Sequence, residues 1–113
     1  MKLSTVVNAI PVISKLMSKK LPVRQSYDVA KLARRIDDET KLYNEQRQKL
    51  LQKYGDQDGD KYVIHPENVD VCNGELEELL NIEVDIPEKI DILSTNVVLT
   101  PAEMIAIEDF LAE

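Results

Sequence analysis

The segment PVRQSYDVAKLARRIDDETKLYNEQRQKLLQKY, residues 22–54, decides the fold of this chain. It contains no Gly, its only Pro is the first residue, and it is rich in Ala, Leu, Lys, Arg, Gln and Glu. These residue types favour the α-helix, so one long helix is predicted over the whole segment. One stripe of residues recurs at alternating steps of four and three, which places its members on one side of that helix. The stripe consists of Val29, Ala33, Ile36, Thr40, Tyr43, Arg47, Leu50 and Tyr54.

This stripe is apolar at both ends and half polar in the middle, at Thr40 and Arg47. The apolar ends predict a spine on which other elements dock. The polar middle favours self-association, because a polar position in such a stripe often fixes how helices pair in an oligomer. A homo-oligomer is therefore one candidate state of the chain.

A second helix is predicted before the spine, within Leu3–Ser18, where apolar residues follow helical spacing. Because Pro11 lacks an N–H group, we expect either a kink there or a helix whose regular part begins at Pro11. The connection to the spine is short, and Pro22 suits the first turn of a helix. The two helices are therefore predicted to form an antiparallel αα-hairpin.

The chain after the spine carries turn and strand signals before it returns to helix. Gly55–Asp60 has the composition of a turn, and Tyr62–Ile64 has that of a short strand. A third helix is predicted from Glu67 to Asn81. Because an internal Asn-Gly pair weakens its first half, the alternative is a helix that starts only at Glu75.

From Ile82 onward the apolar period changes to two, which is the period of a strand. The alternation covers two runs, Ile82–Ile86 and Ile90–Ile92, separated by a bend or sheet edge at Pro87. Asn96–Leu99 is a further extended candidate. These signals predict a small β element beside the helices.

The last helix is predicted from its start signal, the sequence TPAE at residues 100–103. Thr100 suits the N-cap, Pro101 the first helical position and Glu103 the third, which together make a capping box. The full order of elements predicts a mostly helical α+β fold. It combines an N-terminal αα-hairpin with a long second helix, a small β element and a capped C-terminal helix. At 113 residues the chain is predicted to be one domain, residues 1–113.

Charge divides this domain into a basic helical hairpin, residues 1–54, and an acidic α/β part, residues 55–113. The first carries twelve Lys and Arg against five Asp and Glu, a net +7, and the second carries two against sixteen, a net −14. One interpretation is that the two parts fold together and neutralise each other, or are simply solvated. The other is that one face remains for a charged partner, which electrostatic steering would favour.

Two clusters are the candidate contact surfaces under the second interpretation. The basic candidates surround the hairpin connection, where Arg presents a planar fork that suits carboxylates and phosphates. They are Lys19, Lys20, Arg24, Lys31, Arg34 and Arg35. The acidic candidates lie in the second half of the predicted third helix and directly after it. There they would imitate a phosphate backbone or engage a basic groove. They are Glu75, Glu77, Glu78, Glu83 and Asp85.

One metal alternative comes from the acidic segment that follows the spine. Asp56, Asp58, Asp60 and Glu67 fall on positions 1, 3, 5 and 12 of an EF-hand loop, where Ca²⁺ takes oxygen ligands. However, Lys61 stands where the sharp turn demands Gly, and Asp-Gly is also common in hairpin turns. A solvated turn is therefore favoured over a metal site.

No pattern in the sequence indicates an enzyme. His65 and Cys72 are the only histidine and the only thiol, and no P-loop, dinucleotide fingerprint or nucleophile elbow occurs. We therefore expect no catalytic residues and no cofactor. A lone cysteine suits a reducing cytoplasm. No apolar run approaches a membrane span, so no membrane partner is expected. Only 4% of the residues are aromatic, which argues against nucleic acid as a partner.

Four segments resemble those of a group of small proteins encoded by phages and prophages of Gram-positive bacteria. They are KLPVRQSYDVAKLARRI, QRQKLLQKYG followed by an Asp/Gly turn, ELEELLNIEVDI and LTPAEMIAIEDFL. Together they extend over nearly the whole chain. The resemblance implies a phage origin and a place in the host cell cytoplasm, and it brings no catalytic motif.

Three functions agree with that origin. The leading hypothesis is a non-enzymatic binding protein that inhibits a host defence or regulatory protein through a charged surface. The first alternative is an oligomeric sponge that sequesters a nucleotide immune signal with the basic residues, which requires an enclosed basic pocket. The second is a structural or assembly protein of the virion.

Overall fold

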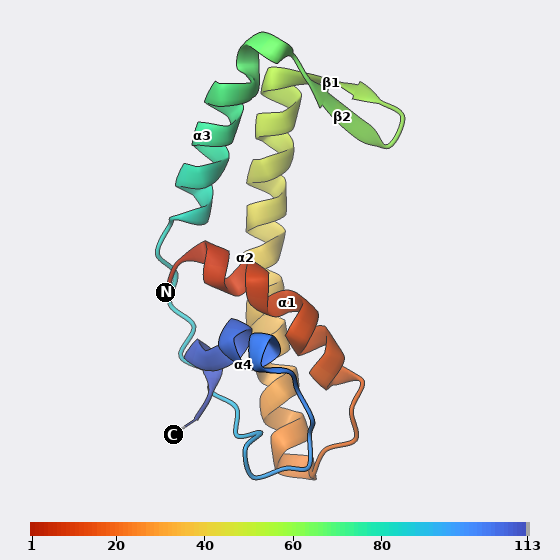
Figure 1. Ribbon diagram of the computed structural model, residues 1–113, viewed down its shortest axis with the longest axis vertical. Coiled ribbons are helices and arrows are strands. Elements are labelled where there is room, and N and C mark those ends of the chain that lie inside the picture. The colour runs from red at the N-terminus through yellow and green to blue at the C-terminus, as the bar shows by residue number, and fades with distance from the viewer. Residues whose placement is uncertain (113) are drawn as a thin grey trace.

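The computed structural model describes residues 1–112 and consists mainly of helices (Figure 1). Its elements, in chain order, are α1 (Leu3–Met17), α2 (Val23–Tyr54), β1 (Gly55–Asp58), β2 (Lys61–Ile64), η1 (Pro66–Asn68), α3 (Val69–Leu80), α4 (Pro101–Ile107) and η2 (Glu108–Phe110). The two strands form an antiparallel hairpin, whereas η1 and η2 are short 3-10 helices. The predicted mostly helical α+β fold is therefore confirmed.

The long helix α2 is the axis of the molecule (Figure 1). α1 crosses its lower half and α3 lies beside its upper half, while the β1–β2 hairpin projects from its C-terminal end. We call residues 40–81, which contain the upper half of α2, the hairpin and α3, the arm. The rest of the described chain, residues 1–39 and 82–112, is the base. The molecule measures 51 × 28 × 24 Å. Its Cα radius of gyration is 16.7 Å, whereas about 13 Å is typical of a compact domain of this length.

The hydrophobic core lies entirely in the base. Val29, Leu32 and Ile36 of α2 are buried against α1, the chain that follows α3, and the C-terminal elements. The other members of this core are Leu3, Val6, Ala9, Val12, Ile13, Leu16, Ile86, Ile90, Ile92, Ile107 and Phe110. In the arm, residues 40–81, Cys72 is the one buried side chain. The arm is therefore held mainly by half-buried contacts.

α1 runs without interruption from Leu3 to Met17, with Pro11 inside it. The expectation that the regular helix begins at Pro11 was therefore wrong. Val12 and Ile13 after the proline are as deeply buried as Leu3 and Val6 before it. Burial along both halves of the helix offsets the hydrogen bond that Pro11 cannot make.

α3 likewise continues through its Asn-Gly pair, so the alternative start at Glu75 was wrong. The helix begins at Val69, directly after the 3-10 turn Pro66–Asn68. Gly74 has no atom near the place of a Cβ, so its role is not one of close packing.

The segments Ile82–Ile92 and Asn96–Leu99 form no strand in the described chain, so the β element predicted there was wrong. Two isolated bridges occur instead, Lys2 with Glu83 and Ile90 with Leu111. The alternation does direct Ile86, Ile90 and Ile92 into the core. However, this segment lies against helix ends, which offer only a few free backbone groups, so no ladder can extend.

The β1–β2 hairpin is closed by a two-residue turn, since Asp58 pairs with Lys61. Gly59 is the first of the two turn residues and has a φ of +63°, the positive value that favours glycine at this position of a hairpin turn. Gly55 joins α2 to the hairpin, and a Cβ there would lie 2.5 Å from the carbonyl oxygen of Val63. Only glycine permits so close an approach.

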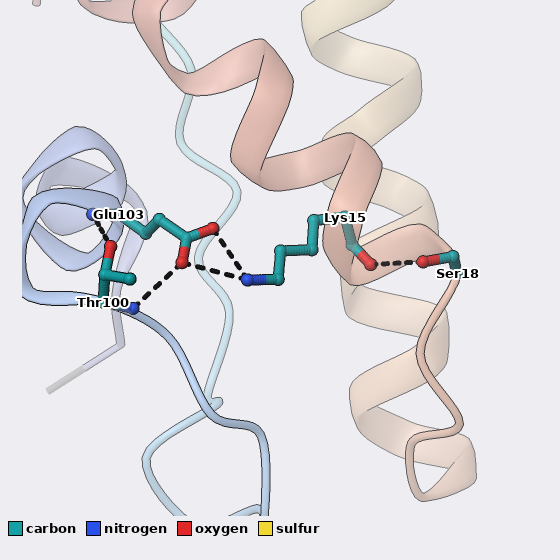
Figure 2. Close-up of polar contacts among 4 residues, drawn as sticks. All are labelled: Lys15, Ser18, Thr100 and Glu103. Atoms are coloured by element: carbon teal, nitrogen blue, oxygen red, sulfur yellow. Dashed lines mark hydrogen bonds and ion pairs between the residues drawn. The ribbon is translucent and has the colours of Figure 1, made fainter.

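The predicted capping box of α4 is present and is tied to α1 (Figure 2). The Thr100 hydroxyl accepts a hydrogen bond from the Glu103 N–H at 3.1 Å, and the Glu103 carboxylate accepts one from the Thr100 N–H at 2.9 Å. The same carboxylate lies 3.0 Å from Nζ of Lys15. The N-terminus of α4 is therefore held both locally and by an ion pair to the basic half.

These contacts predict how acid affects stability. The backbone N–H of Thr100, followed by Lys15, lowers the pKa of Glu103 below its usual 4.5. The charged carboxylate therefore stabilises the fold above pH 4.5, and this contribution is lost as the pH falls through the lowered pKa. We expect Glu103→Gln to shift the urea midpoint less between pH 6 and pH 3 than the wild type shifts. Equal shifts in both proteins would contradict this prediction.

Candidate protein-binding surface

The six basic candidates do not form one cluster in the structure. Lys19 and Lys20 lie in the connection between α1 and α2, and Arg24 lies in the first turn of α2. Lys31 and Arg34 are exposed further along α2. The side chains are therefore spread over about one half of the long helix and the loop before it.

Arg35 differs from the other basic candidates in its contacts. Its Nε lies 3.9 Å from the Glu88 carboxylate, and its guanidinium donates to the carbonyl oxygen of Asp85 at 3.4 Å. The Glu88 side chain is only 18% exposed, so this pair attaches the segment between α3 and α4 to the helix α2. Arg35 is therefore a structural residue.

Three of the basic candidates instead share one exposed side of α2 with a tyrosine. Residues three and four apart on a helix are neighbours on its surface. The set, which we call the basic stripe, is Arg24, Tyr27, Lys31 and Arg34. Tyr27 is 67% exposed. Among residues 1–112, the three charged members make no ion pair, so their charge is free for a partner.

The sequence reasoning missed Tyr27 as part of this surface. The available signal was its spacing, three residues after Arg24 and four before Lys31. Exposed aromatic and Arg side chains are the types that contribute most at protein interfaces.

An apolar groove borders the basic stripe. It lies between α1 and α2 and encloses about 680 Å³. α1 lines it with Ile10 and Met17, and α2 lines it with Ala30 and Ala33. Arg34 lines the groove as well as a hollow beside Tyr27 and Lys31. Charge and apolar surface therefore meet at Arg34.

Lys19 and Lys20 face a separate hollow of about 320 Å³. Its other wall is the loop from Ser94 to Val98. Among the described residues, this hollow shares no lining residue with the hollow beside Lys31 and Arg34. Four of the basic candidates thus divide between two separate open hollows, whereas Arg24 and Arg35 line neither.

The acidic candidates are divided in a similar way. Glu75 lies 3.8 Å from Lys53 of α2, and Glu83 lies 3.2 Å from the N-terminal amine. Glu77 and Glu78 are exposed on α3 and make no ion pair within residues 1–112, while Asp85 contributes its carbonyl oxygen to Arg35. The acidic run is therefore partly internal support and partly solvated surface.

Four ion pairs join the basic half of the chain to the acidic half. They are the N-terminal amine with Glu83, Lys15 with Glu103, Arg35 with Glu88 and Lys53 with Glu75. The two halves therefore neutralise each other at these points. The basic stripe lies outside all four pairs, so its charge remains available, as does that of other cations without an ion pair within residues 1–112, such as Lys19 and Lys20.

The four residues of the calcium alternative are not arranged as in an EF-hand loop, because three lie in the β-hairpin and the fourth lies in the 3-10 turn after it. Asp56 and Asp58 lie on β1, Asp60 lies in the turn and Glu67 lies in η1. The Asp56 carboxylate instead contacts Nε2 of His65 at 3.3 Å. Within residues 1–112 no group of three or more His, Cys, Asp or Glu side chains is placed to hold a metal ion.

Known proteins give no guide to the function of this chain. No protein-family model, curated protein or solved structure matches the chain. Among the helices of residues 1–112, none combines the length and the apolar character that crossing a bilayer requires.

Proposed function

We propose that this chain is a non-enzymatic binding protein that attaches to a carboxylate-bearing surface of a partner protein through its basic stripe. The observation that supports this proposal is the free charge of Arg24, Lys31 and Arg34 around the exposed ring of Tyr27. Arg forms charge-assisted bonds with carboxylates, and Tyr brings a large contact area at a low entropic cost. The adjoining groove adds apolar surface to the same face.

The partner that we propose is a host defence or regulatory protein, which the chain inhibits by covering a charged surface in the host cytoplasm. This part rests on the resemblance to small proteins of phages and prophages. An inhibitor of this kind needs an accessible contact face and no catalytic group. The exposed basic stripe offers such a face along α2.

No second function is advanced. A nucleotide sponge needs an enclosed basic pocket, whereas four of the basic candidates are divided between two open hollows and Arg24 and Arg35 line neither. No feature of the described chain favours a role in the virion.

Charge reversal of the stripe tests the proposal. We expect Lys31→Glu combined with Arg34→Glu to reduce capture of the partner from a defence-bearing Gram-positive host at least about 10-fold, because each charge-assisted contact contributes about 1–3 kcal/mol. Capture by the wild type should also weaken as salt rises. The same variant should fail to inhibit the captured protein in an activity assay.

The matched control is Lys49→Glu combined with Lys61→Glu, which changes the net charge equally at two exposed arm positions. This control should capture the partner as well as the wild type does. If both double variants lose capture equally, net charge is responsible and the proposed surface is wrong. If neither loses capture, the basic stripe is not the contact face.

A further inference from the structure

We infer that the groove between α1 and α2 receives an amphipathic helix of about three turns from the partner protein, with its carboxylates against Lys31 and Arg34. This inference rests on the proposed function and specifies the form that the partner takes at the same face. It follows from the side chains of the groove, its length and its charge.

Small side chains allow another helix to approach closely. α2 contributes Ala30 and Ala33, and α1 contributes Ser14. Helices pack with their axes about 8–10 Å apart, and the shorter distances need small residues at the contact. Met17 beside them is 54% exposed, and its unbranched thioether can adapt to an incoming apolar residue.

The length of the groove suits a short helical segment. Along α2 it extends from Ala30 to Thr40. At a rise of 1.5 Å per residue this is about 15 Å, or about three helical turns. Over that distance an amphipathic helix presents apolar anchors at i, i+3 or i+4, and i+7. An extended peptide would find no sheet edge here, because both walls are helices with internally bonded backbones.

The charge of the groove selects an acidic occupant. Arg34 lines the groove, and Lys31 stands in the hollow next to it. The acidic lining residue Asp37 already lies 3.3 Å from Lys41. The charge left free at the groove is therefore positive, and carboxylates on the incoming helix would complement it.

A second copy of this chain does not provide a suitable helix from its acidic arm. In α3, Cys72 is buried and Leu79 packs against the core. Its exposed large apolar side chains are Val69 and Val71, which are two residues apart and therefore do not form a row on one side of the helix. The outer side of α3 carries exposed carboxylates such as Glu77 and Glu78, without an apolar row between them. A separate partner protein is therefore the occupant that we infer.

The test uses a synthetic stapled helix with Leu at four successive groove-facing positions and Glu on both flanks of that row. The protein has three methionines, Met1, Met17 and Met104. Only Met17 lines the groove, whereas Met1 and Met104 pack against the core. With methyl-¹³C methionine, we expect the Met17 methyl signal to shift saturably during titration while the other two signals stay in place.

Matched peptides and variants locate the contacts. A peptide with Lys in place of Glu should bind the wild type at least about 5-fold more weakly, and Arg34→Glu should reverse this preference, as expected for a charge pair of about 1 kcal/mol. Ser14→Phe, at an exposed position, fills the groove and leaves the basic stripe intact. It should weaken binding of the Glu peptide at least about 10-fold, because the bulky ring occupies the space that the helix needs.

Three results with the purified protein would overturn the inference. The first is an unshifted Met17 signal at millimolar peptide. The second is equal binding of the Glu and Lys peptides. The third is a Met17 signal that moves with protein concentration alone, which would show that a second copy occupies the groove.

If Ser14→Phe still captures the partner while the reversal of Lys31 and Arg34 does not, the helix inference fails and the proposed function stands. If that charge reversal has no effect, the proposed function fails.

Discussion

Phe110→Ala is expected to lower the free energy of unfolding by about 3–5 kcal/mol. Phe110 is fully buried, and it is the only phenylalanine of the chain. It lies in the 3-10 turn that ends α4, in contact with a core otherwise built from aliphatic residues. Truncation to Ala leaves a cavity that the surrounding Val, Ile and Leu side chains fill only in part.

Urea unfolding followed by circular dichroism measures this loss. The control is Ile105→Ala in the same C-terminal segment, where the side chain is 66% exposed. Its effect should stay within about 0.5 kcal/mol. Domains of this size have a total stability of about 5–15 kcal/mol, so a loss of this size takes up much of it, and a milder variant is needed as well. Phe110→Leu, which keeps most of the volume, is then expected to lower stability by about 1 kcal/mol. If Phe110→Ala lowers the free energy of unfolding by less than about 1 kcal/mol, the packing of the C-terminal segment against α1 is contradicted.

Hydrogen exchange should differ at least about 100-fold between the two halves of α2, which corresponds to about 2.7 kcal/mol of local stability. The amides of residues 29–36 belong to the core-bearing half, where Val29, Leu32 and Ile36 are buried. The amides of residues 44–52 belong to the arm. They are expected to exchange through local opening of the arm while the base remains folded.

The contacts of the arm give the physical reason. A hydrogen bond of 2.7 Å joins Gln48 to the Tyr62 hydroxyl, and the pair of Lys53 with Glu75 spans 3.8 Å. Both contacts are partly solvated, and exposed pairs of this kind contribute about 0–1 kcal/mol each. Cys72 is the one side chain buried in residues 40–81.

Exchange followed by NMR on the intact chain measures both halves in one experiment. Since both segments belong to one helix, backbone hydrogen bonding is matched between them. Equal protection along residues 29–52 would show that base and arm unfold as one unit, and it would contradict this prediction.

Local signals in the sequence were sufficient for the elements that depend on neighbouring residues alone. The spine from Val23 to Tyr54 follows from residue propensities, and the start of α4 follows from Thr100, Pro101 and Glu103. The hairpin turn follows from Gly59, which accepts the positive φ that the turn needs. Each of these depends on contacts within about four residues, which the sequence states directly.

Tertiary structure decided what depends on distant neighbours. The apolar alternation from Ile82 to Ile92 is the same for a β-strand and for an extended segment that packs on helices. Only the presence of α1 and α4 beside this segment makes it an extended segment without a strand partner. In α1, burial of both halves overrides the break expected at Pro11.

The candidate surface shows the same division. The sequence alone determined that the basic charge gathers in the first 54 residues and that the long helix carries much of it. It did not distinguish Arg34 from its neighbour Arg35, because the two are adjacent in the chain. Only the folded chain places Glu88 beside Arg35 and leaves Arg34 free at the edge of an apolar groove. The physical reason is that successive helical residues point about 100° apart, so the elements packed around α2 decide which charge is paired and which is available.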